Sequence, residues 1–252
     1  MAINKTLKKQ LSGYFKQTVD LQRNHPELKL VQYNSLINAY QYYTLLASTL
    51  RYIDRGMKIL DWGCGNGHFS FFLCSNGFKP IMYSFDEKPP ILDKVDSDDY
   101  TFVKGEPDEP RLLPFPDNSF EAVFSVGVLE HVREYQGNEI SSLKEISRIL
   151  KKNGLFICSH IPNKLSWKEF ISNFTPGMHH HEFRYTKSEI IRLLDDITLN
   201  LIKIKKYGFL PRTAINRMGT AKISNSPKFT QVYNAIDYLL SIPLYPFLQN
   251  YI

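Results

Sequence analysis

A glycine-rich segment carries the strongest chemical signal in this sequence. It reads Asp61-Trp62-Gly63-Cys64-Gly65-Asn66-Gly67 and lies where an apolar run over 57–61 meets a helical pattern over 69–74. Glycines permit a tight turn and let the backbone approach a ligand closely, because no Cβ intervenes. The free N–H groups at the start of the following helix can hold a carboxylate or a phosphate. The segment therefore predicts a ligand cradle at the carboxyl edge of a sheet.

The spacing of the glycines argues against a dinucleotide. A dinucleotide loop follows the order G-x-G-x-x-G, but the sixth position counted from Gly63 is His68. A second acid, Asp86, follows the next predicted strand, 25 residues after Asp61. Alone it would be interpreted as a turn residue. Behind a glycine loop, its carboxylate is well placed to accept hydrogen bonds from both hydroxyls of a ribose.

Histidines are the candidate bases, since imidazole titrates near neutral pH. His131 follows a predicted strand over 120–126, His160 ends another, and His179-His180-His181 lies in a loop that could close over a substrate. We take His131, His179 and His180 as candidate catalytic residues. The alternative is that each is only a capping or hydrogen-bonded histidine. Three adjacent histidines cannot easily all bind one ion, so we expect no metal.

The elements that would position these residues alternate between strand and helix from residue 57 to about 208. The hydrophobic patterns predict helices over 69–74 and 139–152, a capping box at 186–189, and strands over 57–61, 80–85, 100–103, 120–126, 155–160 and 199–207. This order predicts an α/β fold with a doubly wound, mostly parallel sheet. We divide the chain into an N-terminal helical cap (1–56), a core (57–210), and a basic loop with a C-terminal amphipathic helix (211–252).

The C-terminal segment has its own pattern. Ser226-Pro227 is a favourable helix start. The helix after it has an apolar stripe of Phe229, Val232, Tyr233, Ile236, Leu239 and Leu240. A stripe of this size is expected to pack on the domain, to form a homodimer contact or to rest on a lipid surface. Since Pro246 interrupts the segment after this helix, a final strand over 247–252 should be very short or missing.

Composition limits the class of protein. The chain has 43% hydrophobic and 22% charged residues, as soluble globular proteins do. Its three cysteines are widely spaced, which argues against a disulfide framework and a metal knuckle. With neither a signal-like start nor a long apolar run, we expect a cytoplasmic protein. Seven bases and no acid lie between Lys203 and Lys228. This basic stripe could attract a phosphorylated substrate, a nucleic acid or an anionic membrane, or could simply be a solvated surface.

Three further segments extend the signal of the glycine loop. They are Leu113-Pro114-Phe115-Pro116-Asp117-Asn118-Ser119-Phe120, Val128-Leu129-Glu130-His131-Val132, and the run from Glu145 to Gly154. Together with the loop, they resemble class I S-adenosylmethionine-dependent methyltransferases over residues 57–208. The closest branch contains quinone-biosynthesis, small-molecule and sugar methyltransferases. Asn153 stands where that family usually has a second glycine.

The resemblance implies a Rossmann-like fold, S-adenosylmethionine as cofactor, and a set of binding residues. Asp61, Gly63, Cys64, Gly65 and Gly67 would cradle the methionine part of the cofactor. Asp86 would hold the ribose, Glu106 would meet the adenine amine, and Ser125 would lie beneath the cofactor. Because the segment after Glu106 is longer than usual, Asp108 or Glu109 could serve in its place.

The expected function is methyl transfer to a small-molecule, sugar or lipid-linked acceptor at oxygen, where a general base helps. The alternative is a methyltransferase-like protein that binds the cofactor without turnover. The turn after the predicted strand 120–126 lacks the Asn-Pro-Pro-aromatic sequence of adenine-type amine methyltransferases, and no Pro-Cys pair for pyrimidine methylation is present. A nucleic-acid acceptor is therefore disfavoured. A nucleotide-dependent oxidoreductase is disfavoured by His68.

Overall fold

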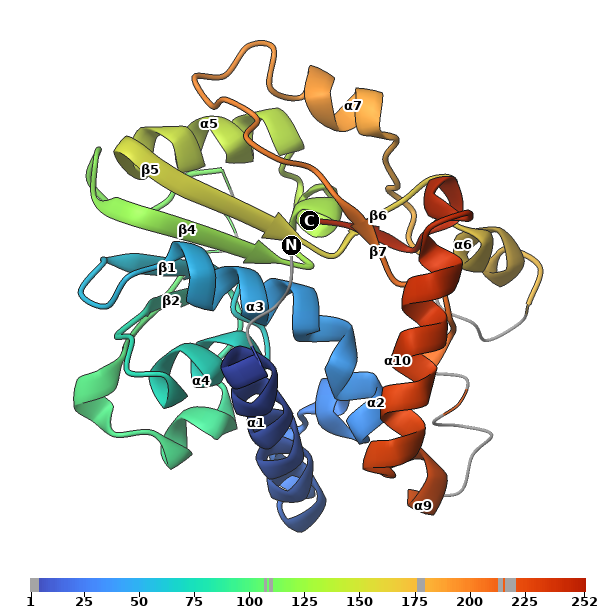
Figure 1. The fold of residues 1–252 in the computed structure, drawn as a ribbon. Helices are drawn as coiled ribbons and strands as arrows, with labels where there is room; N and C mark the ends of the chain where they lie inside the picture. The colour runs from blue at the N-terminus through green and yellow to red at the C-terminus, as the bar shows by residue number, and fades with distance from the viewer. Residues whose placement is uncertain (1–4, 107, 109–110, 176–179, 213–214, 216–220) are drawn as a thin grey trace. The chain divides into compact units, whose positions relative to one another are not determined.

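The computed structural model describes residues 5–106, 108, 111–175, 180–212, 215 and 221–252. The chain forms two compact units (Figure 1). The larger unit contains Arg55–Tyr207 and Pro246–Ile252, and the smaller one contains Met1–Asp54 and Gly208–Tyr245. The segments before and after the core, which the sequence analysis separated, thus belong together, and the last seven residues belong to the larger unit.

A five-stranded parallel sheet is the centre of the larger unit. Its strands stand in the order β3-β2-β1-β4-β5 and are β1 Ile59–Trp62, β2 Ile81–Ser84, β3 Thr101–Lys104, β4 Phe120–Val126 and β5 Leu150–Ser159. All four pairings are parallel. The chain reverses its direction across the sheet between β1 and β4, where Trp62 pairs with Ser125. This confirms the predicted fold class and places a ligand-binding switch point at the end of β1.

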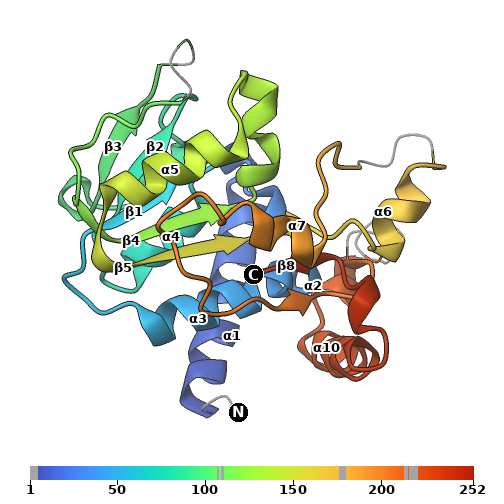
Figure 2. The same cartoon turned by 90° about the horizontal axis from the view of Figure 1, so that it is seen from above.

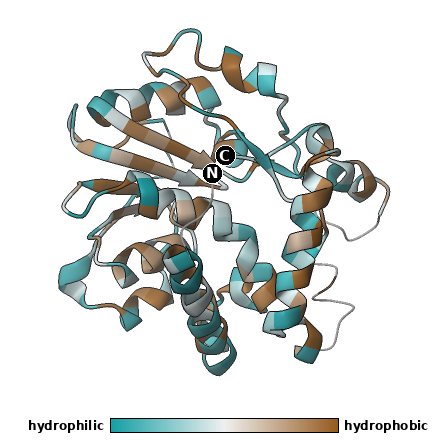
Figure 3. Cartoon of the chain, in the orientation of Figure 1, coloured by the Kyte–Doolittle hydropathy of each residue, from teal (hydrophilic) through white to brown (hydrophobic). Residues whose placement is uncertain are grey.

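Helices cover both faces of this sheet. Side chains of successive strand residues point to opposite faces. On β4, Val123 belongs to the core cluster that includes α5 (Glu139–Ile149), whereas the ring centroid of Phe124 lies 4.8 Å from that of Phe69 in α4 (His68–Ser75). The helices α4 and α5 therefore lie on opposite faces, and Figures 1 and 2 both show α5 running along the sheet. Figure 3 shows the apolar character of β4 and β5.

The passage from α5 into β5 differs from the prediction. The helix was expected to reach residue 152, but it ends at Ile149 and β5 begins at once with Leu150. Leu150 has extended backbone angles (φ −71°, ψ 136°) and pairs with Phe120, with a register shift before Ala122. Residues that continue the helical hydrophobic pattern are thus in a strand, because they pair with β4. Ile140, an apolar residue in the first turn of α5, is 40% exposed.

A small antiparallel sheet completes the larger unit. It has the order β6-β8-β7, with β6 Ile161–Pro162, β7 Lys206–Tyr207 and β8 Asn250–Tyr251. The predicted strand over 199–207 is wrong except for its last two residues, because only these find a partner strand in β8. The very short final strand is confirmed.

Two short helices and several 3-10 turns connect these strands. The helices are α6 Trp167–Ser172 and α7 Lys187–Arg192, and the turns are η4 Pro90–Lys94, η5 Ser97–Asp99 and η6 Leu129–Tyr135. The predicted capping box is present: Thr186 accepts from the backbone N–H of Glu189, and the Glu189 carboxylate accepts from that of Thr186. Ile190 is buried after it, whereas Ile191 is 39% exposed.

The smaller unit is helical. Its helices are α1 Lys5–Asn24, α2 Leu36–Ala39, α3 Tyr43–Tyr52, α9 Ala221–Ser224 and α10 Pro227–Ser241, and its turns are η1 Pro26–Leu28, η2 Val31–Tyr33 and η3 Tyr40–Tyr42. A further turn, η7 Tyr245–Phe247, begins at its last residue and continues into the larger unit. Contacts join its two chain segments. The Leu36 N–H donates to the Asn225 side chain at 3.1 Å, and Arg212 donates to the Ile37 carbonyl at 3.2 Å. Among the described helices, none is both long and apolar enough to cross a membrane.

The helix α10 starts at Ser226-Pro227 as predicted, but its apolar stripe is mostly not buried. Tyr233 is 7% exposed, and the exposed fraction is 38% or more for Phe229, Val232, Ile236 and Leu239. The helix instead buries Thr230 and Asp237. Asp237 pairs with Arg212 at 2.9 Å and accepts hydrogen bonds from the backbone N–H groups of residues 209 and 210. A polar network therefore occupies most of the buried face of this helix, so of the three alternatives for the apolar stripe, packing on the domain applies only to Tyr233.

Candidate functional site

The glycine loop joins β1 to α4. Gly63, Gly65 and Gly67 all have positive φ angles, of 72°, 49° and 75°, which side chains with a Cβ rarely adopt. The backbone N–H groups of Gly63 and Cys64 donate to the Tyr83 carbonyl at 2.8 and 3.0 Å, which fixes the loop against β2. Gly67 is the N-cap residue of α4. The predicted strand–turn–helix is thus present at the carboxyl edge of the sheet.

The three glycines differ in what surrounds them. A Cβ on Gly63 would lie 2.6 Å from Val128, and one on Gly67 would lie 2.8 Å from Ile91, so both positions need glycine for packing. A Cβ on Gly65 would meet no atom of the described chain nearer than the Gly63 carbonyl oxygen, at 4.0 Å. Gly65 therefore faces open space, as a cradle for a ligand requires.

Asp61 links the strand before the loop to the helix after it. Its side chain is buried and accepts a hydrogen bond from Ser70 of α4, with an oxygen–oxygen distance of 2.5 Å. Burial raises the pKa of Asp61 to about 7, although the Ser70 hydrogen bond opposes this shift. Burial also raises the pKa of the Cys64 thiol far above its usual range and lowers the pKa of His68 to about 4. Cys64 therefore keeps a protonated thiol and presents no thiolate to a ligand.

The two other predicted cofactor acids lie at the ends of neighbouring strands. Asp86 is exposed two residues after β2, and Glu106 is exposed two residues after β3. Because β1, β2 and β3 are parallel neighbours, both acids stand at the same edge as the glycine loop. Asp108 is exposed as well, whereas Glu109 lies outside the described residues. Ser125 is fully buried in β4 beside Trp62, at the base of the loop.

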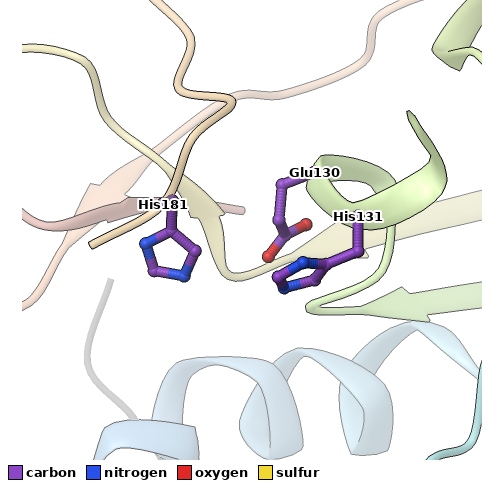
Figure 4. A group of neighbouring side chains, drawn as sticks. All are labelled: Glu130, His131 and His181. Atoms are coloured by element: carbon purple, nitrogen blue, oxygen red, sulfur yellow. The ribbon is translucent and has the colours of Figure 1, made fainter. Parts of the chain in front are cut away.

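A cluster of one carboxylate and two imidazoles lies beyond β4. Glu130 and His131 belong to η6, and His181 comes from the segment before α7. Each residue contributes one side-chain nitrogen or oxygen atom, and these three atoms all lie within 4.8 Å of one another. Figure 4 shows the Glu130 carboxylate between the two rings, whose centroids are 6.0 Å apart. We call these three residues the Glu-His-His cluster.

The sequence analysis identified this cluster only in part. Of the three candidate catalytic residues, His131 belongs to it, His180 is exposed outside it, and His179 lies outside the described residues. His181 was expected only as part of the loop 179–181 that could close over a substrate, and Glu130 was not expected to take part. The adjacent pair Glu130-His131 directly after a strand was the available signal, but nothing in the sequence connects it to a residue fifty positions later.

The cluster is held by further carboxylates. His131 Nδ1 lies 2.7 Å from Glu134 Oε1, and His181 Nδ1 lies 2.9 Å from Glu169 Oε1. Glu130 is 3% exposed, and its Oε2 has no hydrogen-bond partner among the described residues. Burial raises the pKa of Glu130 to about 7, and the nearby histidines only partly offset this shift.

His160, another candidate base, lies outside this cluster and contacts Tyr207. Its Nδ1 lies 2.5 Å from the Tyr207 hydroxyl, and its backbone N–H donates to the same hydroxyl at 3.1 Å. Desolvation lowers the pKa of His160 to about 3. The imidazole is therefore neutral at physiological pH and ties β7 to the end of β5.

Known proteins match the part of the chain that carries the glycine loop and the Glu130-His131 pair. The profile of a family described as a methyltransferase domain matches residues 60–158. A sterol 24-C-methyltransferase of Aspergillus fumigatus is 33% identical over 111 residues, which are 41% of this chain and 28% of that protein. A demethylmenaquinone methyltransferase of Staphylococcus aureus is 32% identical over 110 residues, 42% of this chain and 44% of that one. The chain thus spans less than half the length of these curated relatives.

A solved structure extends the likeness in fold. The structure of a SAM-dependent methyltransferase from Archaeoglobus fulgidus superposes with a TM-score of 0.52 at 20% identity, covering 83% of this chain and 91% of that one. The profile match runs from β1 into β5 and includes the glycine loop and the Glu130-His131 pair.

Proposed function

We propose that this chain, whose residues 60–158 match the profile of a methyltransferase domain, transfers a methyl group from S-adenosylmethionine to an oxygen atom of a small-molecule, sugar or lipid-linked acceptor. The observation that carries the proposal is the loop of three left-handed glycines with open space at Gly65. Such a loop presents backbone N–H groups and a helix start to an anionic group. The carboxylate of a methionine moiety has the charge and size for this place.

The remaining cofactor contacts follow from the strand order. Asp86 beyond β2 would accept hydrogen bonds from the ribose hydroxyls, and Glu106 beyond β3 would accept from the adenine amine. Ser125 would lie under the cofactor. S-adenosylmethionine supplies a methyl group that its sulfonium already activates, so the protein has chiefly to position the acceptor.

His131 is the proposed general base for an oxygen acceptor. It follows β4 at the same sheet edge as the glycine loop, and Val128, three residues earlier, is the side chain that a Cβ on Gly63 would meet. The contact between His131 Nδ1 and Glu134 orients the ring, so Nε2 would take the hydroxyl proton. His179 and His180 stay candidate residues for the acceptor side.

Two observations favour a lipid-linked acceptor over a sugar or another small molecule. The relatives include proteins named for a sterol and for demethylmenaquinone. In addition, α10 exposes Phe229, Val232, Ile236 and Leu239, within a unit that contains eleven lysines and arginines but four acidic residues. An exposed apolar helix face with basic surroundings fits contact with an anionic membrane surface. A homodimer contact through the same face is the competing outcome.

Transfer of a labelled methyl group tests the proposed activity. The full chain is incubated with methyl-labelled S-adenosylmethionine and either a lipid extract or an aqueous metabolite extract. We expect label to enter the lipid fraction, and we expect His131→Ala to reduce the rate at least about tenfold with unchanged cofactor affinity. Cofactor binding without label in either fraction would favour a binding protein without turnover. Label in the aqueous fraction alone would exclude the lipid acceptor.

A further inference from the structure

The buried carboxylate of Glu130 poses a physical problem. The residue is 3% exposed, and Oε2 has no partner in the described part of the chain. A buried carboxylate oxygen without a hydrogen bond or a cation is costly. In Figure 4 the carboxylate points into the space between His131 and His181. The missing partner should therefore be a group that two imidazoles and a carboxylate bind together.

The two histidines are oriented as metal ligands usually are. Each ring contacts an outer carboxylate through Nδ1, His131 at 2.7 Å from Glu134 and His181 at 2.9 Å from Glu169. The backbone N–H of His181 also donates to Glu169 at 3.0 Å, which fixes this segment. A carboxylate on one ring nitrogen sets the tautomer and directs the other nitrogen to the ion. Nε2 is thus the atom through which each histidine would bind.

We propose that Glu130, His131 and His181 bind a divalent transition-metal ion of the zinc type. Two imidazoles and one carboxylate match the donor set of three-ligand zinc sites, whereas calcium and magnesium prefer oxygen ligands throughout. The ligand atoms lie within 4.8 Å of one another. Ligands on a tetrahedral zinc ion stand about 3.3 Å apart, so small side-chain rotations would close the site.

This site differs from the metal site that the sequence analysis disfavoured. The disfavoured site would use three adjacent histidines, whereas the cluster uses only His181 of the three. Three protein ligands leave a coordination position open. An acceptor hydroxyl bound there would lose its proton more readily, so with the ion bound His131 would act as a ligand of the ion and no longer as the free base. This role of the ion rests on the proposed methyltransferase function, but binding of the ion does not.

Metal binding can be measured without cofactor or acceptor. The full chain is stripped with a chelator and titrated with zinc chloride by calorimetry, and with magnesium chloride for comparison. We expect one zinc ion per chain and little heat with magnesium. Glu130→Gln and His181→Ala should each weaken zinc binding at least about tenfold. His180→Ala is the matched control, because this exposed neighbour would contribute only to adventitious binding by the histidine run.

The outcomes separate this inference from the proposed function. Zinc binding that survives both cluster substitutions, or that His180→Ala weakens as much as His181→Ala does, would overturn the site. So would a wild-type chain that binds S-adenosylhomocysteine but no zinc, and the methyltransferase proposal would then stand alone. Zinc binding without S-adenosylhomocysteine binding would support the site and remove the methyltransferase role. Circular dichroism establishes that each variant is folded, and His131→Ala replaces any variant that is not.

Discussion

At the scale of residues, burial explains the unusual pKa of Asp61, the acid that precedes the glycine loop. Asp61 is 1% exposed, and its carboxyl group accepts a hydrogen bond from the Ser70 hydroxyl. Its position is fixed by the fold, since β1 pairs on both sides and α4 begins seven residues later. A carboxyl group in such a place favours its protonated form in the folded state. Asp61, which links β1 to α4 on the two sides of the loop, therefore has a charge that depends on pH.

This dependence gives a prediction for stability. The pKa of Asp61 is raised from 3.8 to about 7 in the folded chain, so between these values the unfolded chain binds fewer protons than the folded one. Stability from this residue is then lost as pH rises from about 4 to about 7. Relative to Asp61→Asn, the wild-type free energy of unfolding should fall across that range, by on the order of 4 kcal/mol at most. Urea unfolding at a series of pH values measures it, and parallel curves for the two proteins would contradict the assignment.

Sequence reasoning succeeded at this scale where the site is contiguous. The glycine loop, its acid and its flanking elements occupy one short stretch, so spacing alone predicts their arrangement. The Glu-His-His cluster is different. Its third member reaches Glu130 only because the segment before α7 is fastened by Glu169, and such a contact between distant residues leaves no periodic signal in the sequence.

At the scale of elements, predictions held where the hydrophobic period was unambiguous. The strand β4 was predicted with its observed bounds of 120 and 126, because both of its faces are covered. The predictions failed where pairing with another strand decides the secondary structure. Leu150 continues the helical stripe of α5 but pairs with Phe120, and most of 199–207 finds no partner strand. Edge segments such as these depend on a neighbour that local propensity does not describe.

The helix α10 gives a prediction at the same scale. Asp237 is 7% exposed and pairs with Arg212, which also donates to Asn234 and to the Ile37 carbonyl. Removing one member of a buried pair leaves an uncompensated charge, which costs about 3–5 kcal/mol. Asp237→Ala should therefore destabilise the helical unit by about that amount in urea unfolding.

The matched control is an ion pair on the surface of the same unit. Arg23 and Asp20 of α1 stand 3.1 Å apart with side chains 57% and 46% exposed. Exposed pairs of this kind contribute less than about 1 kcal/mol, so Asp20→Ala should have little effect. Equal losses for the two substitutions would show that burial of the Arg212–Asp237 pair does not matter.

At the scale of the whole molecule, positive charge gathers in the helical unit. Its formal charge is strongly positive, whereas the larger unit has twenty bases and twenty-one acids. Sequence analysis found the basic stripe and the amphipathic helix. It did not foresee that the N-terminal segment joins them, because the contacts of Leu36 with Asn225 and of Ile37 with Arg212 bridge most of the chain.

Vesicle binding tests the proposed membrane contact. The wild-type chain should sediment with vesicles that contain phosphatidylserine and much less with neutral ones, because both basic charge and apolar insertion contribute. Val232→Asp with Leu239→Asp should reduce sedimentation by at least about tenfold. Leu112→Asp is the control, since Leu112 is 59% exposed on the other unit. Loss of a dimer in light scattering with unchanged vesicle binding would assign the face to a homodimer instead.

The central claim is that the glycine loop holds S-adenosylmethionine, and calorimetric titration with S-adenosylhomocysteine tests it most directly. Gly65→Ala adds a methyl group into open space at a φ of 49°, and Gly77→Ala imposes similar backbone strain at a φ of 77°, away from the loop. We predict that the wild type and Gly77→Ala bind alike and that Gly65→Ala binds at least about tenfold more weakly, because its Cβ enters the ligand space. A folded Gly65→Ala chain that binds as tightly as the wild type would contradict the account.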